Sequence, residues 1–172
     1  RRPLEALCHN EEIAESPFFN IFTQIHVGPM PAGEIQQLIA EPSETAGLPL
    51  APHAETITKL AGHLPFYVQI ACSAAFDHLS HNEGSFDKRA VERRFAEETN
   101  SHFRYIWDRL EEVEANAVAA IISGTPLDEN QREALDDLLN DGYIIARGEG
   151  YQLFSTAFVR FLRKNAAEAI PR

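Results

Sequence analysis

The 172-residue sequence contains no long apolar run and few cysteines. No apolar stretch approaches the roughly 18 to 20 residues that a membrane-spanning helix needs, and the N-terminal residues show no secretory signal pattern. Cys8 and Cys72 lie far apart, and Cys72 falls within a strongly apolar segment. Two such cysteines do not make a disulfide framework and fit a reduced compartment. We therefore expect a cytoplasmic protein that makes no use of a membrane.

Positive charge is also scarce, because 15 Lys and Arg oppose 26 Asp and Glu to give a formal net charge of −11. This balance opposes non-specific attraction to nucleic acid and to anionic lipid. An apolar share of 44% with 24% charged residues is ordinary for a globular protein. The chain is long enough for one domain or for two small ones.

No group of residues shows the spacing of a metal or catalytic site. His78 and His81 lie three residues apart, but structural zinc needs four converging ligands and no second Cys/His pair is near. Cys8 and His9 are adjacent in the chain, and adjacent side chains rarely point at one another. Three pairs of neighbouring glutamates lie in polar stretches that favour solvated faces. We expect neither a metal ion nor a catalytic residue in this chain.

The most informative segment is LAGHLPFYVQIAC, residues 60–72. Gly62 can end one helix in a left-handed conformation, and Pro65 can occupy the first turn of the next helix, where its missing N–H is no loss. Apolar residues then go most of the way round the helical wheel from residue 66 to 79. This pattern predicts an enclosed helix at the centre of the first part of the chain.

The remaining pattern is mainly helical, with an alternating segment at 21–27 that predicts a strand. Apolar spacing and turn residues predict helices over 34–40 (ending near Pro42), 53–61, 86–110 and 112–123, and one helix from an N-cap at Asp128 to Gly142.

After Gly142 the apolar period changes from helical to two-residue. Segments 143–147 and 151–154, joined at 148–150, predict a hairpin, and Ser155 can cap a last helix. Helix, helix, hairpin and helix is the order of a winged helix, here abbreviated because the stretch 124–127 is too short for a middle helix. Residues 128–142 hold six acidic residues and one arginine, a net of −5, which favours contact with protein over DNA.

Segments 16–39, 61–72 and 138–162 together resemble the C-terminal half of bacterial AAA-like ATPases of the STAND group, the signal-transduction ATPases with numerous domains. In that group a P-loop domain precedes a helical lid and a winged helix. The lid carries a Gly-Gly-x-Pro or Gly-x-Pro turn whose proline approaches the adenine. The resemblance implies that Pro65 is this proline and Gly62 the first glycine, with His63 in the usual place of the second. It also matches Arg1 or Arg2 to the arginine that senses the terminal phosphate.

The resemblance implies a mainly α fold: a helical-bundle lid followed by a winged-helix domain with a small β-hairpin, plus an N-terminal strand remnant of the ATPase core. The corresponding ranges are 1–30 for the end of the core, 31–85 for the lid, 86–111 for a connecting helix and 112–172 for the winged helix. No G-x-x-x-x-G-K-[ST] phosphate loop occurs. The opening RRPLEALC has neither an initiator methionine nor a clear helix cap, so we expect a piece of a longer protein that does not hydrolyse ATP by itself.

The function implied is regulatory, in signal transduction. The lid would close over ATP or ADP, with Mg, in the full-length protein, and no nucleotide is expected on this piece alone. Its partners would be the P-loop domain and an effector protein. Two alternatives stay open: a DNA-binding winged-helix transcription regulator with a helical sensing domain, and a nucleotide-independent interaction module. Because an unpaired strand is a template for another chain, self-association through 17–27 is a further expectation.

Overall fold

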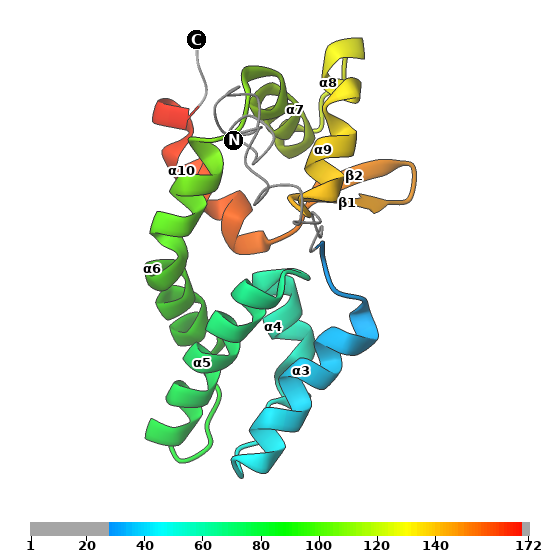
Figure 1. Cartoon of the computed structure of the whole chain (residues 1–172). Coiled ribbons are helices and arrows are strands. Elements are labelled where there is room, and N and C mark those ends of the chain that lie inside the picture. The colour runs from blue at the N-terminus through cyan, green and yellow to red at the C-terminus, as the bar shows by residue number, and fades with distance from the viewer. Residues whose placement is uncertain (1–27, 170–172) are drawn as a thin grey trace, which may run out of the picture.

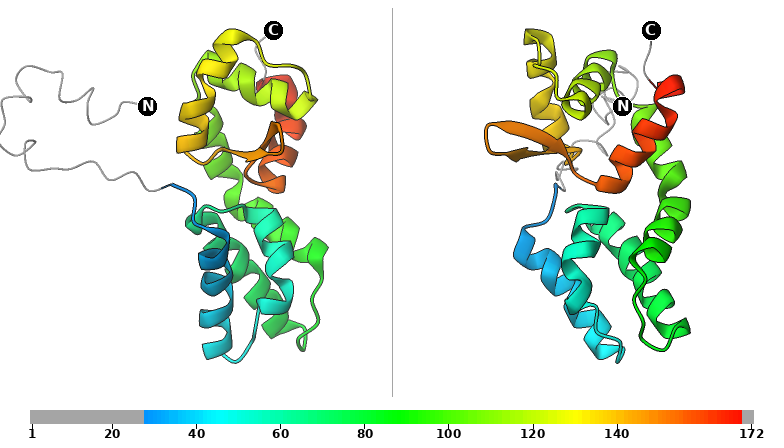
Figure 2. Two further views of the ribbon diagram at one scale, coloured as in Figure 1. Left: turned by 90° about the vertical axis from the view of Figure 1, so that its right-hand side faces the viewer. Right: turned by 180° about the vertical axis from the view of Figure 1, so that it is seen from behind.

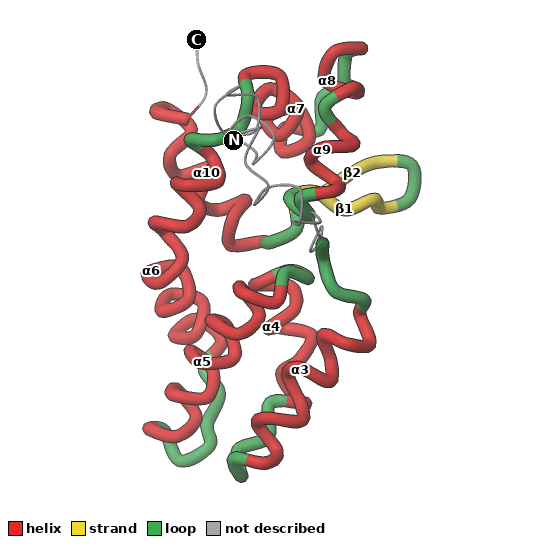
Figure 3. Tube along the Cα trace, viewed as in Figure 1, coloured by secondary structure: helices red, strands yellow, loops and turns green. Residues whose placement is uncertain are grey.

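The computed structural model describes residues 28–169, and side chains as far as residue 165. The predicted strand at 21–27, the self-association segment at 17–27, and Arg1 and Arg2 lie outside the described residues. The described chain is mainly helical and carries one small two-stranded antiparallel sheet, which confirms the predicted fold class (Figures 1 and 3). No helix within 28–169 combines the length and apolarity needed to cross a bilayer.

The elements follow one another in two groups that share a long helix (Figure 1). They are α3 (Ala32–Thr45), a single 3-10 turn (Ala51–His53), α4 (Ala54–Ala61), α5 (Pro65–His81), α6 (Lys88–Trp107), α7 (Glu112–Ser123), α8 (Glu129–Glu133), α9 (Leu135–Asn140), β1 (Ile144–Arg147), β2 (Gly150–Leu153) and α10 (Thr156–Ala169). Helices α3, α4 and α5 form the lower group, and α7 to α10 with the hairpin form the upper one. Helix α6 runs along both groups and packs on α5 and α10.

Helix α5 has the central place that its composition predicts, because α3, α4 and α6 all pack against it. Its buried residues are Tyr67, Val68, Ala71, Ala74, Ala75 and Leu79. Three alanines among them let neighbouring backbones approach closely. The prediction of enclosure is wrong for Phe66, which is 49% exposed. Its ring lies edge-on to exposed His102 of α6, with ring centroids 4.9 Å apart, because the first turn of α5 reaches the surface there.

The sequence predicted that the helix begun near residue 34 ends near Pro42, but α3 continues to Thr45. A proline this close to a helix end removes one backbone hydrogen bond and leaves the last turn possible. Side chains support that turn: Ser43 Oγ donates to the Ile39 carbonyl at 2.8 Å, and Thr45 Oγ1 donates to the Glu41 carbonyl at 2.9 Å. Local hydroxyl bonds therefore carry the helix past the proline.

The single helix predicted from Asp128 to Gly142 is two helices, α8 and α9, separated by a bend at Ala134. Asp128 is the N-cap, as predicted, and forms a capping box with Gln131. Helix α8 buries no residue, whereas α9 buries Leu135 and Leu138. The chain bends because only the second half carries apolar residues for the core. The stretch 124–127 forms no helix, as the sequence predicted, and the short helix α8 follows it, between α7 and α9.

The hairpin and the last helix form as predicted. Ile144 pairs with Leu153 and Arg147 with Gly150, so the turn is two residues long where the sequence suggested three. The Ser155 hydroxyl accepts the N–H groups of Ala157 and Phe158, both at 3.2 Å, and caps α10. An aromatic cluster joins this region to α6 and α5, with rings from Tyr67, Phe95, Phe103, Phe154, Phe158 and Phe161.

Candidate functional site

The turn at residues 62–65 joins α4 to α5. Gly62 has φ 79° and ψ −151°, and its N–H donates to the Thr58 carbonyl at 2.7 Å. The positive φ agrees with the prediction, but ψ is extended and not left-handed helical, a combination essentially confined to glycine. Pro65 occupies the first turn of α5, and the Leu64 carbonyl accepts the N–H groups of Tyr67 and Val68. Glycine and proline therefore set the direction in which the chain enters α5.

His63 fixes one side of this turn to the segment that leads into α3. The Met30 N–H donates to the His63 carbonyl at 2.9 Å, and His63 Nδ1 lies 3.3 Å from the Met30 carbonyl oxygen. In the tautomer that carries its proton on Nδ1, the His63 ring donates a hydrogen bond to the Met30 carbonyl oxygen. The histidine side chain is thus turned towards the entering chain, and it gives the turn a backbone partner 33 residues earlier.

Gly62 lies directly against the end of the hairpin. A Cβ at this position would fall 2.3 Å from the Phe154 carbonyl oxygen and 2.8 Å from the Phe154 ring. A Cβ atom essentially never lies this close to a non-bonded atom, so only glycine allows the two backbones to meet here without a shift. This close approach joins the lower group of helices to the upper one.

The end of α4 and the start of α10 are held together by two hydroxyl groups. Ser155, which is 1% exposed, donates from Oγ to the Leu60 carbonyl at 2.5 Å. Thr156 Oγ1 donates to the Lys59 carbonyl at 2.9 Å. These carbonyls belong to the last turn of α4, where the helix itself provides no partner. Ser155 therefore caps two helices at once, α4 at its C-terminus and α10 at its N-terminus.

A third contact comes from the loop before β1. Gly142 has φ 72°, and a Cβ there would lie 3.0 Å from Leu64 Cδ2 and 3.2 Å from Pro29 Cδ. The turn is thus enclosed by the entering chain, by the loop at residue 142 and by the end of the hairpin. None of the four residues 62–65 is Asp, Glu, Lys or Arg, so the turn presents an apolar surface with one imidazole.

Tyr67 lies beneath the turn, with its ring centroid 5.3 Å from that of Phe103 and 5.4 Å from that of Phe154. Burial raises the pKa of its hydroxyl far above the ordinary value, and nearby Tyr143 raises it further. The phenol therefore stays protonated and cannot serve as a base at neutral pH. Its neighbour Phe66 remains exposed beside Pro65.

Three predicted site residues lie together in this turn: Gly62 is buried, while His63 and Pro65 are half-buried. The sequence did not point to Met30, Phe154 or Gly142, because nothing local in their segments indicates a contact with the turn. Ser155 was predicted as a cap for α10, but its bond to the Leu60 carbonyl joins positions 95 residues apart. Among residues 28–165, no cluster of three or more His, Cys, Asp or Glu has the arrangement of a metal site.

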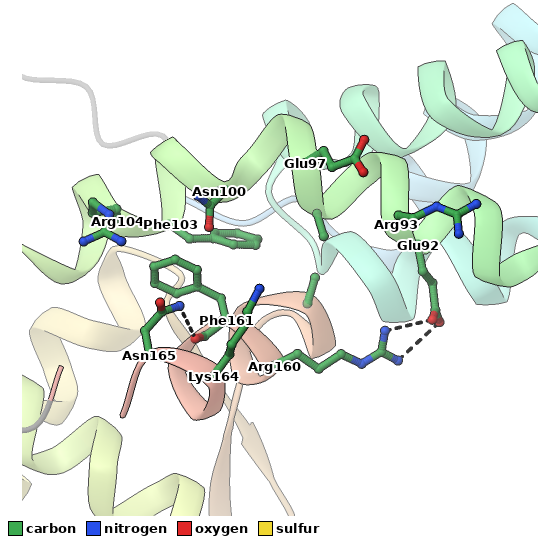
Figure 4. A pocket seen from close by; sticks show the side chains of 12 residues that line it. Glu92, Arg93, Glu97, Asn100, Phe103, Arg104, Arg160, Phe161, Lys164 and Asn165 are labelled. Atoms are coloured by element: carbon green, nitrogen blue, oxygen red, sulfur yellow. Dashed lines mark hydrogen bonds and ion pairs between the residues drawn. The ribbon is translucent and has the colours of Figure 1, made fainter. Parts of the chain in front are cut away.

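A groove with a volume of about 630 Å³ lies elsewhere, between α6 and α10 (Figure 4). It shares no lining residue with the turn. The turn and the groove are therefore separate features.

Residues 1–127 match the family model of novel STAND NTPase 2, nSTAND2. The chain belongs to this STAND NTPase family. The matched region contains the turn and α3 to α7, together with Arg1 and Arg2. The resemblance to STAND proteins that the sequence suggested is thus confirmed at the level of the family. Comparisons with curated proteins and with solved structures give no match.

Proposed function

We propose that this chain is the regulatory lid and winged-helix portion of a STAND ATPase, coupling the ATP or ADP state to a protein partner or effector domain. In this proposal residues 31–85 form the lid, 86–111 the connecting helix, and 112–172 the winged helix, while 1–30 complete the nucleotide-binding core. The full-length protein would hydrolyse ATP with Mg, and this chain would supply no catalytic residue.

The observation that carries the proposal is the attachment of the turn, and of the end of α4 just before it, to segments that are distant in the sequence. Met30 is hydrogen-bonded to His63, and Ser155 to Leu60. A lid that moves when nucleotide is exchanged would therefore carry the entering segment and the start of α10 with it. Such rigid movement of packed elements is an established way of transmitting ligand state.

Pro65 is suited to contact a base. It is half-buried and belongs to a turn without a formal charge, so an apolar ring surface is available beside exposed Phe66. The side chain of His63 is directed towards Met30, which allows a residue larger than glycine at that position. In the full-length protein Arg1 or Arg2 would contact the terminal phosphate, as the resemblance implies.

The charge of the upper group favours a protein partner over DNA. Asp136 and Asp137 are exposed on α9, the helix before the hairpin, and α9 has no basic residue. On the hairpin, the Arg147 guanidinium donates to Gln152 Oε1 at 2.7 Å. Carboxylates facing phosphates would oppose binding. Micromolar binding of random duplex at low salt, with a steep salt dependence, would instead favour the transcription-regulator alternative.

The test is ADP binding by the full-length protein carrying Pro65→Ala, with Pro52→Ala as the matched control. Both prolines start a helix in the lower group, and Pro52 is exposed at the 3-10 turn. Each change should lower the free energy of unfolding by about 1 kcal/mol or less. Loss of roughly 40 Å² of ring contact with adenine would cost about 1 kcal/mol of binding, or about five-fold in affinity.

Only Pro65→Ala should weaken ADP binding. Unchanged ADP affinity in a folded Pro65→Ala protein would leave this proline as a helix-starting residue and remove the nucleotide contact. Absence of any ADP binding by the unaltered full-length protein would favour the alternative of a nucleotide-independent interaction module.

A further inference from the structure

The groove between α6 and α10 combines an apolar floor with a basic rim. Phe103 and Phe161, both buried, lie side by side in it, with ring centroids 5.8 Å apart (Figure 4). Its volume of about 630 Å³ is in the range of sites that accept a small molecule. Four cationic residues line it: Arg93, Arg104, Arg160 and Lys164.

Most of this positive charge is not neutralised within the described part of the chain. The Arg160 guanidinium donates to both Glu92 carboxylate oxygens, at 2.8 and 3.3 Å. Within residues 28–165, none of the recorded ion pairs includes Arg93, Arg104 or Lys164. Glu97 is the other carboxylate that lines the groove. A net positive groove is thus present on a chain whose net charge is −11, and its chemistry selects an acidic occupant.

An acidic segment of matching character lies on the opposite side of the same chain. Residues 128–137, which form α8 and the start of α9, carry five exposed carboxylates, Asp128, Glu129, Glu133, Asp136 and Asp137, against one arginine. Helix α8 buries none of its residues in its own chain. In Figures 1 and 2 this segment lies on the far side of the upper group from α6 and α10. The groove and the acidic segment cannot meet within one molecule in this arrangement.

We propose that the groove receives the 128–137 segment of a second copy of this chain. The contact is head to tail, because the two surfaces differ and lie on opposite sides. Carboxylates of α8 and α9 from one copy face Arg104 and Lys164 of the other. The charged residues of the rim and of the segment are exposed, and salt screens attraction between exposed charges. The association should therefore weaken as the salt concentration rises. The proposal requires neither a nucleotide nor the turn at 62–65, and so it goes beyond the regulatory function proposed above.

The experiment is sedimentation velocity of the chain over a range of concentrations, in about 50 mM and about 300 mM NaCl. We expect self-association whose dissociation constant rises at least about ten-fold between the two salt conditions. A groove variant, Arg104→Gln with Lys164→Gln, and a segment variant, Glu133→Gln with Asp137→Asn, should each weaken association by about ten-fold or more. All four side chains are exposed, so the variants should fold, which circular dichroism would verify.

Mixing the two variants gives the decisive result. The groove variant retains its acidic segment and the segment variant retains its groove, so the mixture should form a one-to-one complex that does not extend further. Arg163→Gln is the matched control, because Arg163 lies on α10 but does not line the groove. It should leave the dissociation constant unchanged within about two-fold.

Two results would overturn the proposal. One is a monomer at about 200 µM chain in low salt. The other is self-association that none of the groove or segment substitutions alters, which would place the contact on another surface, such as residues 17–27.

Discussion

Replacing Gly62 with alanine tests whether the close approach of the turn to the hairpin holds the two groups of helices together. The added Cβ meets two obstacles. The backbone at Gly62 has φ 79° and ψ −151°, a region that side-chain-bearing residues hardly occupy. The Cβ would also lie 2.3 Å from the Phe154 carbonyl oxygen. That oxygen belongs to the backbone beside the cap of α10, so it cannot turn aside as a flexible side chain would.

The expected loss of stability follows from these two terms. Backbone strain of this kind costs on the order of 1 to 3 kcal/mol, and overpacking a closely packed site costs about 1 to 3 kcal/mol more. We expect Gly62→Ala to lower the free energy of unfolding by about 3 to 5 kcal/mol. A domain of ordinary stability has about 5 to 15 kcal/mol in total, so the variant should lose a large fraction of its stability.

Gly124→Ala is the matched control. Gly124 also has a positive φ, 72°, and also ends a helix, but its ψ of 22° is left-handed helical and a Cβ there meets nothing within 4 Å. Gly124→Ala should therefore lower the free energy of unfolding only by the cost of placing alanine in a left-handed conformation, about 1 to 2 kcal/mol. Urea unfolding followed by circular dichroism measures both variants. If Gly62→Ala lost no more stability than Gly124→Ala, the contact with Phe154 would not be a rigid one and our reasoning would be refuted.

Three further results are expected. Ser155→Ala removes the cap of α10 and leaves the Leu60 carbonyl without its hydroxyl donor, so urea unfolding should show a loss of about 2 to 3 kcal/mol, against about 1 kcal/mol or less for exposed Thr156→Ala. Burial raises the pKa of the Cys72 thiol to about 11. In a chain whose other cysteine is replaced by serine, Cys72 should therefore react slowly with iodoacetamide at pH 7.5 and much faster when the chain is unfolded in urea. Fast reaction of the folded chain would contradict this burial. Partial burial lowers the pKa of His53 below 6.5, so the unfolded chain binds more protons than the folded chain as the pH falls through this range, and the free energy of unfolding should decline there. The decline should be smaller in His53→Phe, which removes the titrating group. An equal decline in both proteins would assign the effect to other groups.

Local chemistry made much of this fold predictable. Helix α7 covers the predicted range, Glu112–Ser123, and α8 begins at the predicted capping residue, Asp128. The hairpin was marked by the change from a helical to a two-residue period after Gly142 and by the glycines of the 148–150 turn. In each case the residues that decide the conformation lie within a few positions of one another, so the local sequence pattern is enough to predict where the element begins or ends.

Predictions were wrong where distant packing or additional bonds decided the outcome. Proline at position 42 indicated a helix end, but hydroxyl bonds from Ser43 and Thr45 extended the helix past it. The division between α8 and α9 depends on which side chains reach the core, and no local signal marks Ala134 as a bend. The candidate site shows the same limit. Its glycine and proline were visible in the sequence, while the contacts with Phe154 lie about 90 residues away along the chain.

The contacts around the turn also determine how nucleotide binding could act at a distance. If Pro65 contacts adenine, the path from nucleotide to α10 is short: the turn contains Gly62, Gly62 meets Phe154, and the next residue, Ser155, caps α10. Each step of this path is a direct contact or a peptide bond, so a shift at the turn can be passed to α10. Ser155→Ala weakens this connection without altering Pro65, and in the full-length protein it should therefore preserve ADP affinity while reducing the response of the partner or effector. Equal loss of ADP binding in Ser155→Ala and Pro65→Ala would show that the two positions act only through the stability of the turn.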